Sequence, residues 1–453
     1  MCIRDRVTTA PLNPARTDHP VEDALGDPDR VDSELDAISV TTLPNGVRVA
    51  TEHMAHARSV ALGVWVELGA RDEDEAEIGI CHFFEHMAFK GTEERSAFET
   101  ALLLDGVGGY QNAFTGHETT RFEMEVPVTA APLALELMVD LVARPAIRSA
   151  DVEAERTVIL EELHGYLDQP DYLHARSLDE AQYGDHPLGR EITGTAETLR
   201  NIGAEQLRAF HDQGYGGANV VVAAAGAVDH QQVCDIVGSV LDARRSVARP
   251  RRLAPPAFTP GVVAIERPTE QVYVSQGFRS IERTHKDLVA LRVGMHVLGG
   301  GDASRLHREI REDRGLAYWI SASDFAYSDG GEVTVATAVA PGKFAEAQQI
   351  IHDCIEDCRT NGITEAEFQR SLGASRGALH MALQTPGSRM RRLGSELIID
   401  KRIVPIAEDL AELDSITLDQ VNATLARVLG GPSITAVLGP SEVLEQAEAL
   451  PAQ

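Results

Sequence analysis

Lysine is scarce in this chain of 453 residues, and it occurs only at Lys90, Lys286, Lys343 and Lys401. Asp and Glu number 70 against 41 Lys and Arg, which gives a formal net charge of −29. Nucleic acids and anionic membranes are polyanions, so this balance argues against either partner and favours basic peptides. The same acidity is also typical of an ordinary self-repelling surface, so the charge alone identifies no ligand.

Cysteine is also rare. The five cysteines are an odd number without the paired spacing of a secreted disulfide framework, which favours a reducing compartment. No run of eighteen apolar residues is present, so we expect no membrane insertion. Residues 1–36 lack an apolar signal core and are too acidic for a transit peptide. We therefore expect a disordered N-terminal tail and a cytoplasmic protein.

The length is too great for one hydrophobic core and suits two domains of about 200 residues each. Residues 246–261 hold four prolines beside an arginine cluster, a composition typical of an interdomain linker. The prediction is a tail at 1–36, an N-terminal zinc-binding catalytic domain at 37–245, the linker at 246–261 and a C-terminal domain at 262–453.

The apolar periodicity predicts a similar order of elements in both halves. In the first half we expect strands at 39–43, 47–50, 60–68, 110–115, 119–126 and 219–226, and helices at 96–104, 130–147, 150–167, 204–213 and 231–241. In the second half we expect strands at 272–278, 317–323, 331–339 and 434–438, and helices at 286–298, 304–312, 344–361, 365–384, 387–399 and 418–428. This pattern predicts an α+β fold of two similar domains from an internal duplication, each a mostly antiparallel sheet backed by helices.

One stretch of the first half, residues 81–92, carries the arrangement H-x-x-E-H. On a helix, His82 and His86 are four residues apart and share one face, where both imidazoles can reach a single cation. Glu85 lies beside them, where it can take a proton from a water that the metal activates. This geometry predicts hydrolysis. The alternative is an amphipathic helix with hydrogen-bonded core histidines, which is the commoner explanation of an isolated pair.

Catalytic zinc takes three protein ligands and keeps one open position, and Glu162 is a candidate for the third ligand. Glu155 precedes it by seven residues and shares its helix face, so it could hold a ligand histidine or the surroundings of Glu162. Glu161 and His164 form an E-x-x-H pattern that would suit a di-iron enzyme, but no convincing second copy exists. A second metal site can be imagined at His352, Cys354 and Cys358, although core thiols are the simpler interpretation.

From Ala37 onward the chain resembles the pitrilysin and insulinase family of zinc peptidases, and most closely its half-length branch, which includes the mitochondrial processing peptidase. In that family the glutamate ligand follows the second histidine by 76 positions, which is the spacing of Glu162 from His86. The family's extra carboxylate, seven positions earlier, falls on Glu155. The resemblance implies one Zn²⁺ per chain on His82, His86 and Glu162, with Glu85 as general base.

Two further stretches resemble the family. Residues 109–115 are similar to its edge strand, which implies that Asn112, Ala113 and Phe114 contact a substrate added as an extra strand; a purely structural hairpin is the alternative. Residues 304–306 and 311–318 resemble the family's arginine and tyrosine region. This implies that Arg311 and Tyr318 bind the substrate carbonyl or its oxyanion. The second half lacks the metal motif, so the resemblance makes it an inactive homologous domain.

We therefore expect a zinc metalloendopeptidase that cleaves short or unfolded peptides. The alternative is a non-catalytic peptide-binding subunit of a heterodimeric peptidase. The family assembles its chamber from four domains and one chain supplies two, so the resemblance implies a homodimer or a heterodimer with a paralogous subunit. In such a dimer, Arg311 and Tyr318 could reach the zinc of the partner.

Overall fold

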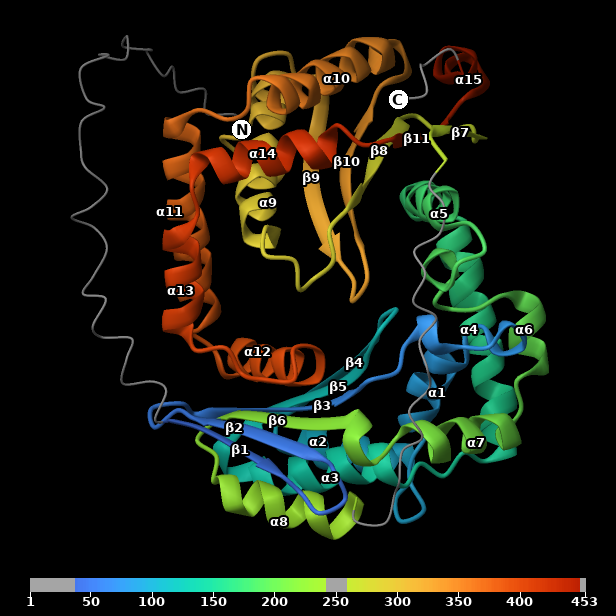
Figure 1. Ribbon diagram of the computed structural model, residues 1–453. Coiled ribbons are helices and arrows are strands. Elements are labelled where there is room, and N and C mark those ends of the chain that lie inside the picture. The colour runs from blue at the N-terminus through green and yellow to red at the C-terminus, as the bar shows by residue number, and fades with distance from the viewer. Residues whose placement is uncertain (1–36, 242–258, 449–453) are drawn as a thin grey trace, which may run out of the picture.

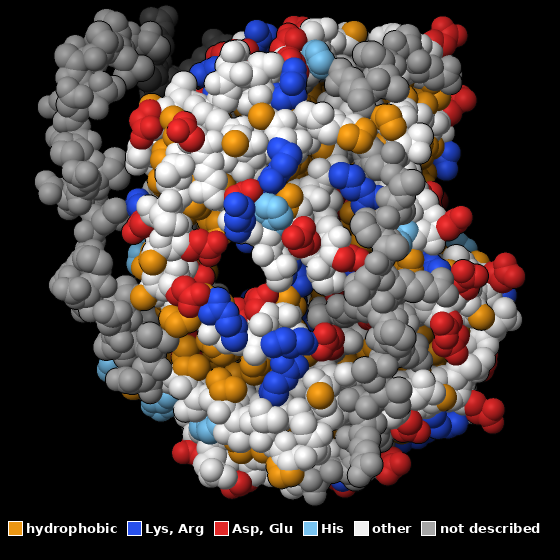
Figure 2. All heavy atoms as spheres, in the orientation of Figure 1, with side chains coloured by type: hydrophobic (Ala, Val, Ile, Leu, Met, Phe, Trp, Pro, Cys, Tyr) orange, Lys and Arg blue, Asp and Glu red, His pale blue; other side chains and the backbone are white. Residues whose placement is uncertain are grey.

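A computed structural model describes residues 37–241 and 259–448. The predicted tail and most of the predicted linker lie outside these residues, and Gly261, the last position of that linker, begins a strand. Figure 1 shows two halves facing one another, the first in blue to green and the second in yellow to red. Figure 2 shows an opening between them, with acidic and basic side chains at its rim.

The first half contains a six-stranded sheet in the order β1-β2-β6-β3-β5-β4. All neighbours are antiparallel except the pair β2 and β6. The expected hairpin at the start is confirmed by the pairing of β1 with β2. The strands are β1 (Ile38–Thr42), β2 (Arg48–His53), β3 (Ser59–Val66), β4 (Tyr110–Thr115), β5 (Thr120–Pro127) and β6 (Val220–Gly226).

Helices cover one face of this sheet because β3 alternates, with Val60, Leu62, Val64 and Val66 pointing into a shared core. That core also holds Phe84 and the apolar sides of several helices. The helices of this half, apart from one treated below, are α1 (Ile80–Ala88), α2 (Ala97–Gly106), α3 (Ala131–Ala143), α4 (Ser149–Leu167), α6 (Ala196–Asn201), α7 (Ala204–Gly214) and α8 (His230–Leu241).

The second half has a five-stranded sheet in the order β7-β11-β8-β10-β9. Its parallel pair, β7 and β11, takes the place of β2 and β6, and its other edge, β9, takes the place of β4. The strands are β7 (Gly261–Glu266), β8 (Val272–Ser280), β9 (Ala317–Ala326), β10 (Gly331–Val339) and β11 (Ser433–Gly439). The predicted fold class, two similar and mostly antiparallel sheets backed by helices, is therefore confirmed.

Helices also back the second sheet. They are α9 (Leu288–Met295), α10 (Phe344–Thr360), α11 (Glu365–Ala382), α13 (Ile406–Ser415), α14 (Leu418–Leu429) and α15 (Ser441–Glu448), with wider helical turns η9 (His296–Gly300) and η10 (His307–Glu312). Within residues 37–241 and 259–448, no helix combines the length and the apolar character needed to cross a bilayer.

One helix from each half packs on the sheet of the other half. Helix α12 (Pro386–Ile399) belongs to the second half but lies on the free face of the first sheet, where Met390 and Leu393 pack with Trp65 in one cluster. Helix α5 (Pro170–Tyr183) belongs to the first half but packs on the second sheet, where Leu178 clusters with Ile434. The predicted elements included α12 but omitted α5.

The tips of two hairpins, one from each half, meet at a buried ion cluster. Glu118, in the turn between β4 and β5, accepts hydrogen bonds from Arg71 at 2.8 Å and from Ser328 Oγ at 2.6 Å. Arg283 of the second half reaches the other oxygen of Glu118 at 3.2 Å, and Arg71 also pairs with Asp329. This cluster joins the ends of the two sheet edges formed by β4 and β9.

Candidate metal centre

Helix α1, which carries the H-x-x-E-H residues, is fixed where it begins. Its N-cap, Gly79, has a φ of +94°, a left-handed conformation that favours glycine. Glu73 accepts the backbone N–H groups of Gly79 and Cys81, both at 2.8 Å. A Cβ atom on Gly79 would lie 2.6 Å from Cα of Gly194, so the two loops touch directly. This contact and the Glu73 cap fix the direction in which α1 enters the core.

The structure brings the three predicted ligands together. The rings of His82 and His86 have centroids 4.6 Å apart, and Glu162 of α4 faces both. Its Oε2 lies 3.9 Å from His82 Nε2 and 3.3 Å from His86 Nε2. Two ligand atoms on one tetrahedral zinc, each about 2.1 Å from the ion, lie about 3.4 Å apart. Two imidazoles and one carboxylate at these separations therefore fit zinc.

Two of the three ligands, His82 and Glu162, have charge states at neutral pH that suit metal binding. Burial, reinforced by the neighbouring His86, lowers the pKa of His82 to about 4, which keeps its imidazole neutral. The hydrogen bond with His86 lowers the pKa of Glu162 to about 2, so its carboxylate is ionised. For His86, burial lowers the pKa, but hydrogen bonds to Glu162 and Glu155 outweigh burial and raise it. Metal binding would displace the proton that these carboxylates attract to His86.

Three contacts outside the ligand set hold the ligands in place. Glu155 Oε1 lies 3.0 Å from His86 Nδ1, as the sequence predicts for this carboxylate. The other oxygen of Glu155 pairs with Lys90. Tyr166 donates a hydrogen bond of 2.8 Å to Glu162 Oε1. The sequence analysis missed Lys90 and Tyr166, although each follows a ligand by four residues, the spacing that could have revealed them.

Glu85 lies on the same helix and is bonded to the sheet edge. Thr115, the last residue of β4, donates its hydroxyl hydrogen bond to Glu85 Oε2. Burial raises the pKa of Glu85, while the Thr115 hydrogen bond acts in the opposite direction. A carboxylate with a raised pKa is better matched to proton transfer near neutral pH. Thr115 was another residue that the sequence analysis did not single out.

Strand β4, which contains Asn112, Ala113 and Phe114, forms the edge of the first sheet. Gly116 donates its backbone N–H to the Thr119 carbonyl in the turn, so by antiparallel alternation the main-chain groups of Ala113 and Thr115 face away from β5. The side chains of Asn112 and Phe114 are exposed. The guanidinium group of Arg121 lies 5.0 Å from the centre of the Phe114 ring. The open edge therefore ends next to Glu85.

The structure pairs Arg311 and Tyr318 with each other but not with the metal ligands. The Arg311 guanidinium lies 5.4 Å from the centre of the Tyr318 ring, which is 81% exposed. Arg311 also contacts His307 Nε2 at 3.2 Å. Within the described ranges, no hydrogen bond or ion pair joins either residue to His82, His86 or Glu162.

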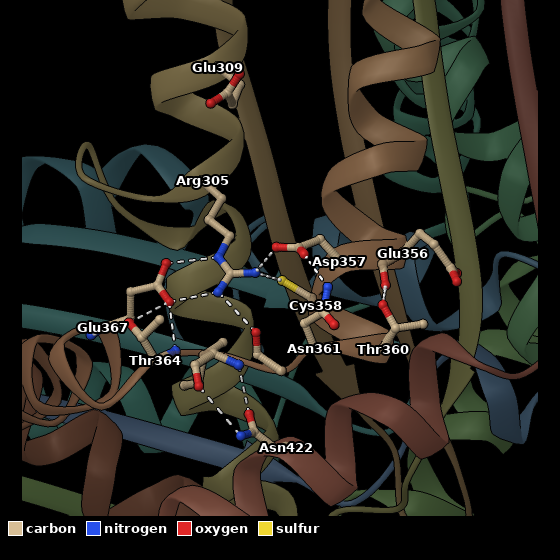
Figure 3. A network of polar contacts seen from close by, with 12 residues as sticks. Arg305, Glu309, Glu356, Asp357, Cys358, Thr360, Asn361, Thr364, Glu367 and Asn422 are labelled. Carbon is tan, nitrogen blue, oxygen red and sulfur yellow. Dashed lines mark hydrogen bonds and ion pairs between the residues drawn. The ribbon is translucent and has the colours of Figure 1, made fainter.

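Arg305, in the same stretch, has a structural role that Figure 3 shows. Its guanidinium donates to both oxygens of Glu367, at 2.8 and 2.7 Å, to Asp357 at 2.8 Å and to the Gly362 carbonyl at 3.0 Å. These bonds tie the segment that leads to Arg311 onto α10 and α11. The cavity beside it, of about 590 Å³, is lined by charges of both signs and includes none of the metal ligands.

The other metal sites considered from the sequence are not formed in the part of the chain that the structure describes. Glu161 and His164 are exposed on α4. Cys354 and Cys358 lie on α10, and Cys358 contacts Arg305 at 3.4 Å. Among the described residues, His82, His86 and Glu162 are the one group of metal-binding side chains whose ligand atoms lie within 4.8 Å of one another.

Two family models match the chain. Residues 48–196 match the model described as Insulinase (Peptidase family M16), and residues 201–374 match the one described as Peptidase M16 inactive domain. A Mycobacterium leprae protein named as an uncharacterized zinc protease is 38% identical over 407 residues, which cover 88% of this chain and 91% of that protein. The uncharacterized zinc protease YmxG of Bacillus subtilis is 32% identical over 401 residues, covering 88% and 98%.

Solved structures share the fold. A crystal structure described as a peptidase M16 inactive domain from Pseudomonas fluorescens superposes with a TM-score of 0.82 at 19% identity, covering 89% of this chain and 98% of that one. A protease from Helicobacter pylori gives a TM-score of 0.81 at 20% identity, covering 89% and 99%. At these identities the likeness supports the architecture alone.

Proposed function

Because the chain belongs to the insulinase family of peptidases, family M16, we propose that it is a zinc-dependent endopeptidase of short or unfolded peptides. Relatives named zinc proteases support a peptidase-type hydrolase. The observation that carries the proposal is the convergence of His82, His86 and Glu162 beside a half-buried Glu85. A subunit that only binds peptides would not require a carboxylate held at the metal site.

In this proposal His82 Nε2, His86 Nε2 and Glu162 Oε2 hold the zinc ion. When bound, zinc supplies Lewis acidity toward the peptide carbonyl and toward a water molecule. The Glu85 carboxylate accepts the proton of the attacking water and returns it to the leaving amide nitrogen. Thr115 keeps the Glu85 carboxylate turned toward the end of the edge strand during both transfers.

The substrate would add to β4 as a further antiparallel or parallel strand. The outward main-chain groups of Ala113 and Thr115 are not paired with β5; the Ala113 N–H contacts Asn112 Oδ1 at 3.0 Å and the Thr115 backbone bonds Glu85, and an extended peptide would take over such local bonds. Only a chain segment without its own secondary structure can lie along this edge, which favours short or unfolded peptides. Asn112 and Phe114 would then contact the substrate through their exposed side chains.

Arg311 and Tyr318 would act in the site of a second subunit, either an identical chain or a paralogue. Two observations support this part of the proposal: the pair is preformed, and it makes no polar contact with the metal ligands within the described residues of its own chain. In the partner's site the pair would donate hydrogen bonds to the carbonyl oxygen as it gains negative charge.

The first test compares the wild type with Glu85→Gln on a library of unstructured peptides, with products identified by mass spectrometry. The variant should keep one zinc per chain and lose cleavage by about 10²-fold or more, because the amide cannot accept the proton. Glu161→Gln, an exposed carboxylate on α4, is the matched control. Full cleavage by Glu85→Gln would refute the assignment. A wild type that holds zinc but cleaves nothing would favour the peptide-binding alternative.

The second test asks whether the active site is shared between subunits. Glu85→Gln and Arg311→Ala homodimers are each expected to be inactive, yet after subunit exchange a mixed dimer would contain one intact site. Recovery of activity on mixing would support the shared site. No recovery, or an active monomer by light scattering, would contradict it.

A further inference from the structure

The single lysine of the first half of the chain lies at the metal centre. Lys90 follows helix α1 by two residues, and its ammonium group pairs with Glu155 Oε2. Glu155 Oε1 lies 3.0 Å from His86 Nδ1, and His86 Nε2 faces Glu162. We propose that Lys90 is a positioning residue for zinc, which holds Glu155 in the orientation that fixes the His86 imidazole. This inference rests on the zinc site of the proposed function.

Glu155 needs this partner because its carboxylate is buried, with only 5% of the residue exposed. Within the described residues, its Oε2 atom has no hydrogen-bond partner other than the ion pair with Lys90. A buried carboxylate oxygen without a partner is costly, so the side chain would reorient once the ammonium group is removed. Any reorientation of Glu155 also removes the hydrogen bond that orients His86.

In the part of the chain that the structure describes, the other ligand histidine has no comparable support. His82 Nδ1 is buried and, among the described residues, has no hydrogen-bond partner. Of the two imidazoles, only the ring of His86 is therefore held through its outer nitrogen. Partners that orient a ligand histidine in this way usually change metal affinity by 10- to 100-fold. Zinc affinity should therefore depend on the orientation of His86, and through it on Lys90, more than in a site where both rings are anchored.

The backbone of Lys90 is held by hydrogen bonds on both sides of the residue. The Lys90 N–H donates to the Met87 carbonyl at 3.1 Å, and its own carbonyl accepts from Arg148 at 3.4 Å. The residue is thus fixed on both sides of its Cα atom. Lys343, in contrast, pairs with Glu346 three residues away on an exposed helix end. These two lysines provide a matched comparison between a positioned ammonium group and a surface one.

The test measures zinc affinity by competition with a chromogenic chelator, which does not depend on catalysis. Lys90→Met should weaken zinc binding by about tenfold, the lower end of the range for outer partners. Lys90→Arg should restore part of this loss because it returns the positive charge, and Lys343→Met should bind zinc like the wild type. A cooperative unfolding transition of each metal-free variant, measured by chemical denaturation, would show that the variant is folded. Wild-type affinity in folded Lys90→Met would overturn the inference.

A double-mutant cycle tests whether Lys90 acts through Glu155. In Glu155→Gln, where the buried charge is already absent, adding Lys90→Met should change zinc affinity by less than about twofold. If the losses in zinc affinity of the two single variants multiply in the double variant, Lys90 does not act through Glu155, and the proposal is overturned. A wild type that binds zinc tightly but cleaves no peptide would refute the proposed function alone, because the affinity differences among these variants would still stand.

Discussion

The hydroxyl group of Thr115 donates a hydrogen bond to the carboxylate of Glu85, and this bond joins the sheet edge to the metal helix. Thr115 is the last residue of β4, and its main-chain groups face the open edge. A peptide that pairs with this edge would therefore lie against the residue that orients the proposed base. Substrate binding and proton transfer therefore meet at one residue, the first through its main chain and the second through its side chain.

Replacing Thr115 with valine should lower kcat and leave KM almost unchanged. Valine has the same shape, so it keeps the strand and the backbone bond to Glu85 but removes the hydroxyl donor. A hydrogen bond to a charged group contributes about 1.5–3 kcal/mol, which corresponds to a loss of roughly 10- to 100-fold in kcat. Thr115→Ser should restore most of the rate. Steady-state kinetics on one cleaved peptide would check this, and a raised KM with normal kcat would show a role in binding instead.

Removing the hydroxyl group of Tyr166 should weaken zinc binding. Tyr166 holds Glu162 Oε1, which leaves Oε2 to face the two histidines. Without this bond the carboxylate can rotate, and we expect Tyr166→Phe to lose up to about tenfold in affinity. Tyr172, whose ring stacks on Tyr166 at 4.8 Å and which bonds Glu191, offers the control Tyr172→Phe. Equal zinc affinity in both variants would contradict the assigned role.

Acid should destabilise the protein through His117, at the hairpin tip where the two halves meet. Burial lowers the pKa of His117 from 6.5 to about 4. The unfolded chain therefore takes up a proton below about pH 6.5 that the folded chain resists until about pH 4, so stability falls as the pH falls through this window. His117 is half-buried, and we expect a contribution of about 1–2 kcal/mol between pH 7 and pH 5.

Urea unfolding of the wild type and of His117→Gln at both pH values would measure this contribution. The variant should lose less stability on acidification, because glutamine does not titrate. The same acid sensitivity in both proteins would place the effect elsewhere.

Adding one methyl group at Gly394 should destabilise the fold. A Cβ atom there would lie 2.3 Å from Cζ3 of Trp65, so the indole ring would have to move out of its packed position between α12 and the first sheet. Such overpacking costs about 1–3 kcal/mol. Gly377 of α11 has open space around it, and Gly377→Ala should instead be neutral or stabilise by about 0.5–1 kcal/mol. Chemical denaturation of both variants would check the contrast.

The sequence was most informative where local periodicity and function coincide. The strand at 331–339 and the helix at 150–167 follow directly from alternating or helical apolar patterns, and the strand at 110–115 follows from the turn at Gly116 that ends it. The metal ligands could be identified because helical spacing places His82 and His86 on one face. Lys90 and Thr115 carry no such signal, since their importance depends on contacts with Glu155 and Glu85 that only the tertiary structure creates.

Helix α5 was missed for a physical reason. Its buried face contains His174, Ser177 and Gln182 as well as Leu178, so the apolar pattern is weak. His174 is satisfied in the fold by the Ala436 carbonyl at 3.1 Å, a partner 262 residues away. Burial of polar side chains against a distant sheet cannot be predicted from the local sequence. The exchange of α5 and α12 between the halves was hidden for the same reason.

Because of that exchange, each half depends on the other to complete the packing of its sheet. A fragment ending before the second half would expose Trp65 and the alanines of β6, and the complementary fragment would expose Ile434 and Ala436, because each lacks the helix that covers them. The half without metal ligands cannot be discarded as a redundant copy, because it completes the core of the half that has them. The second half can therefore differ from the first in sequence and lack a metal site, yet removing it would uncover the sheet that carries the edge strand beside Glu85.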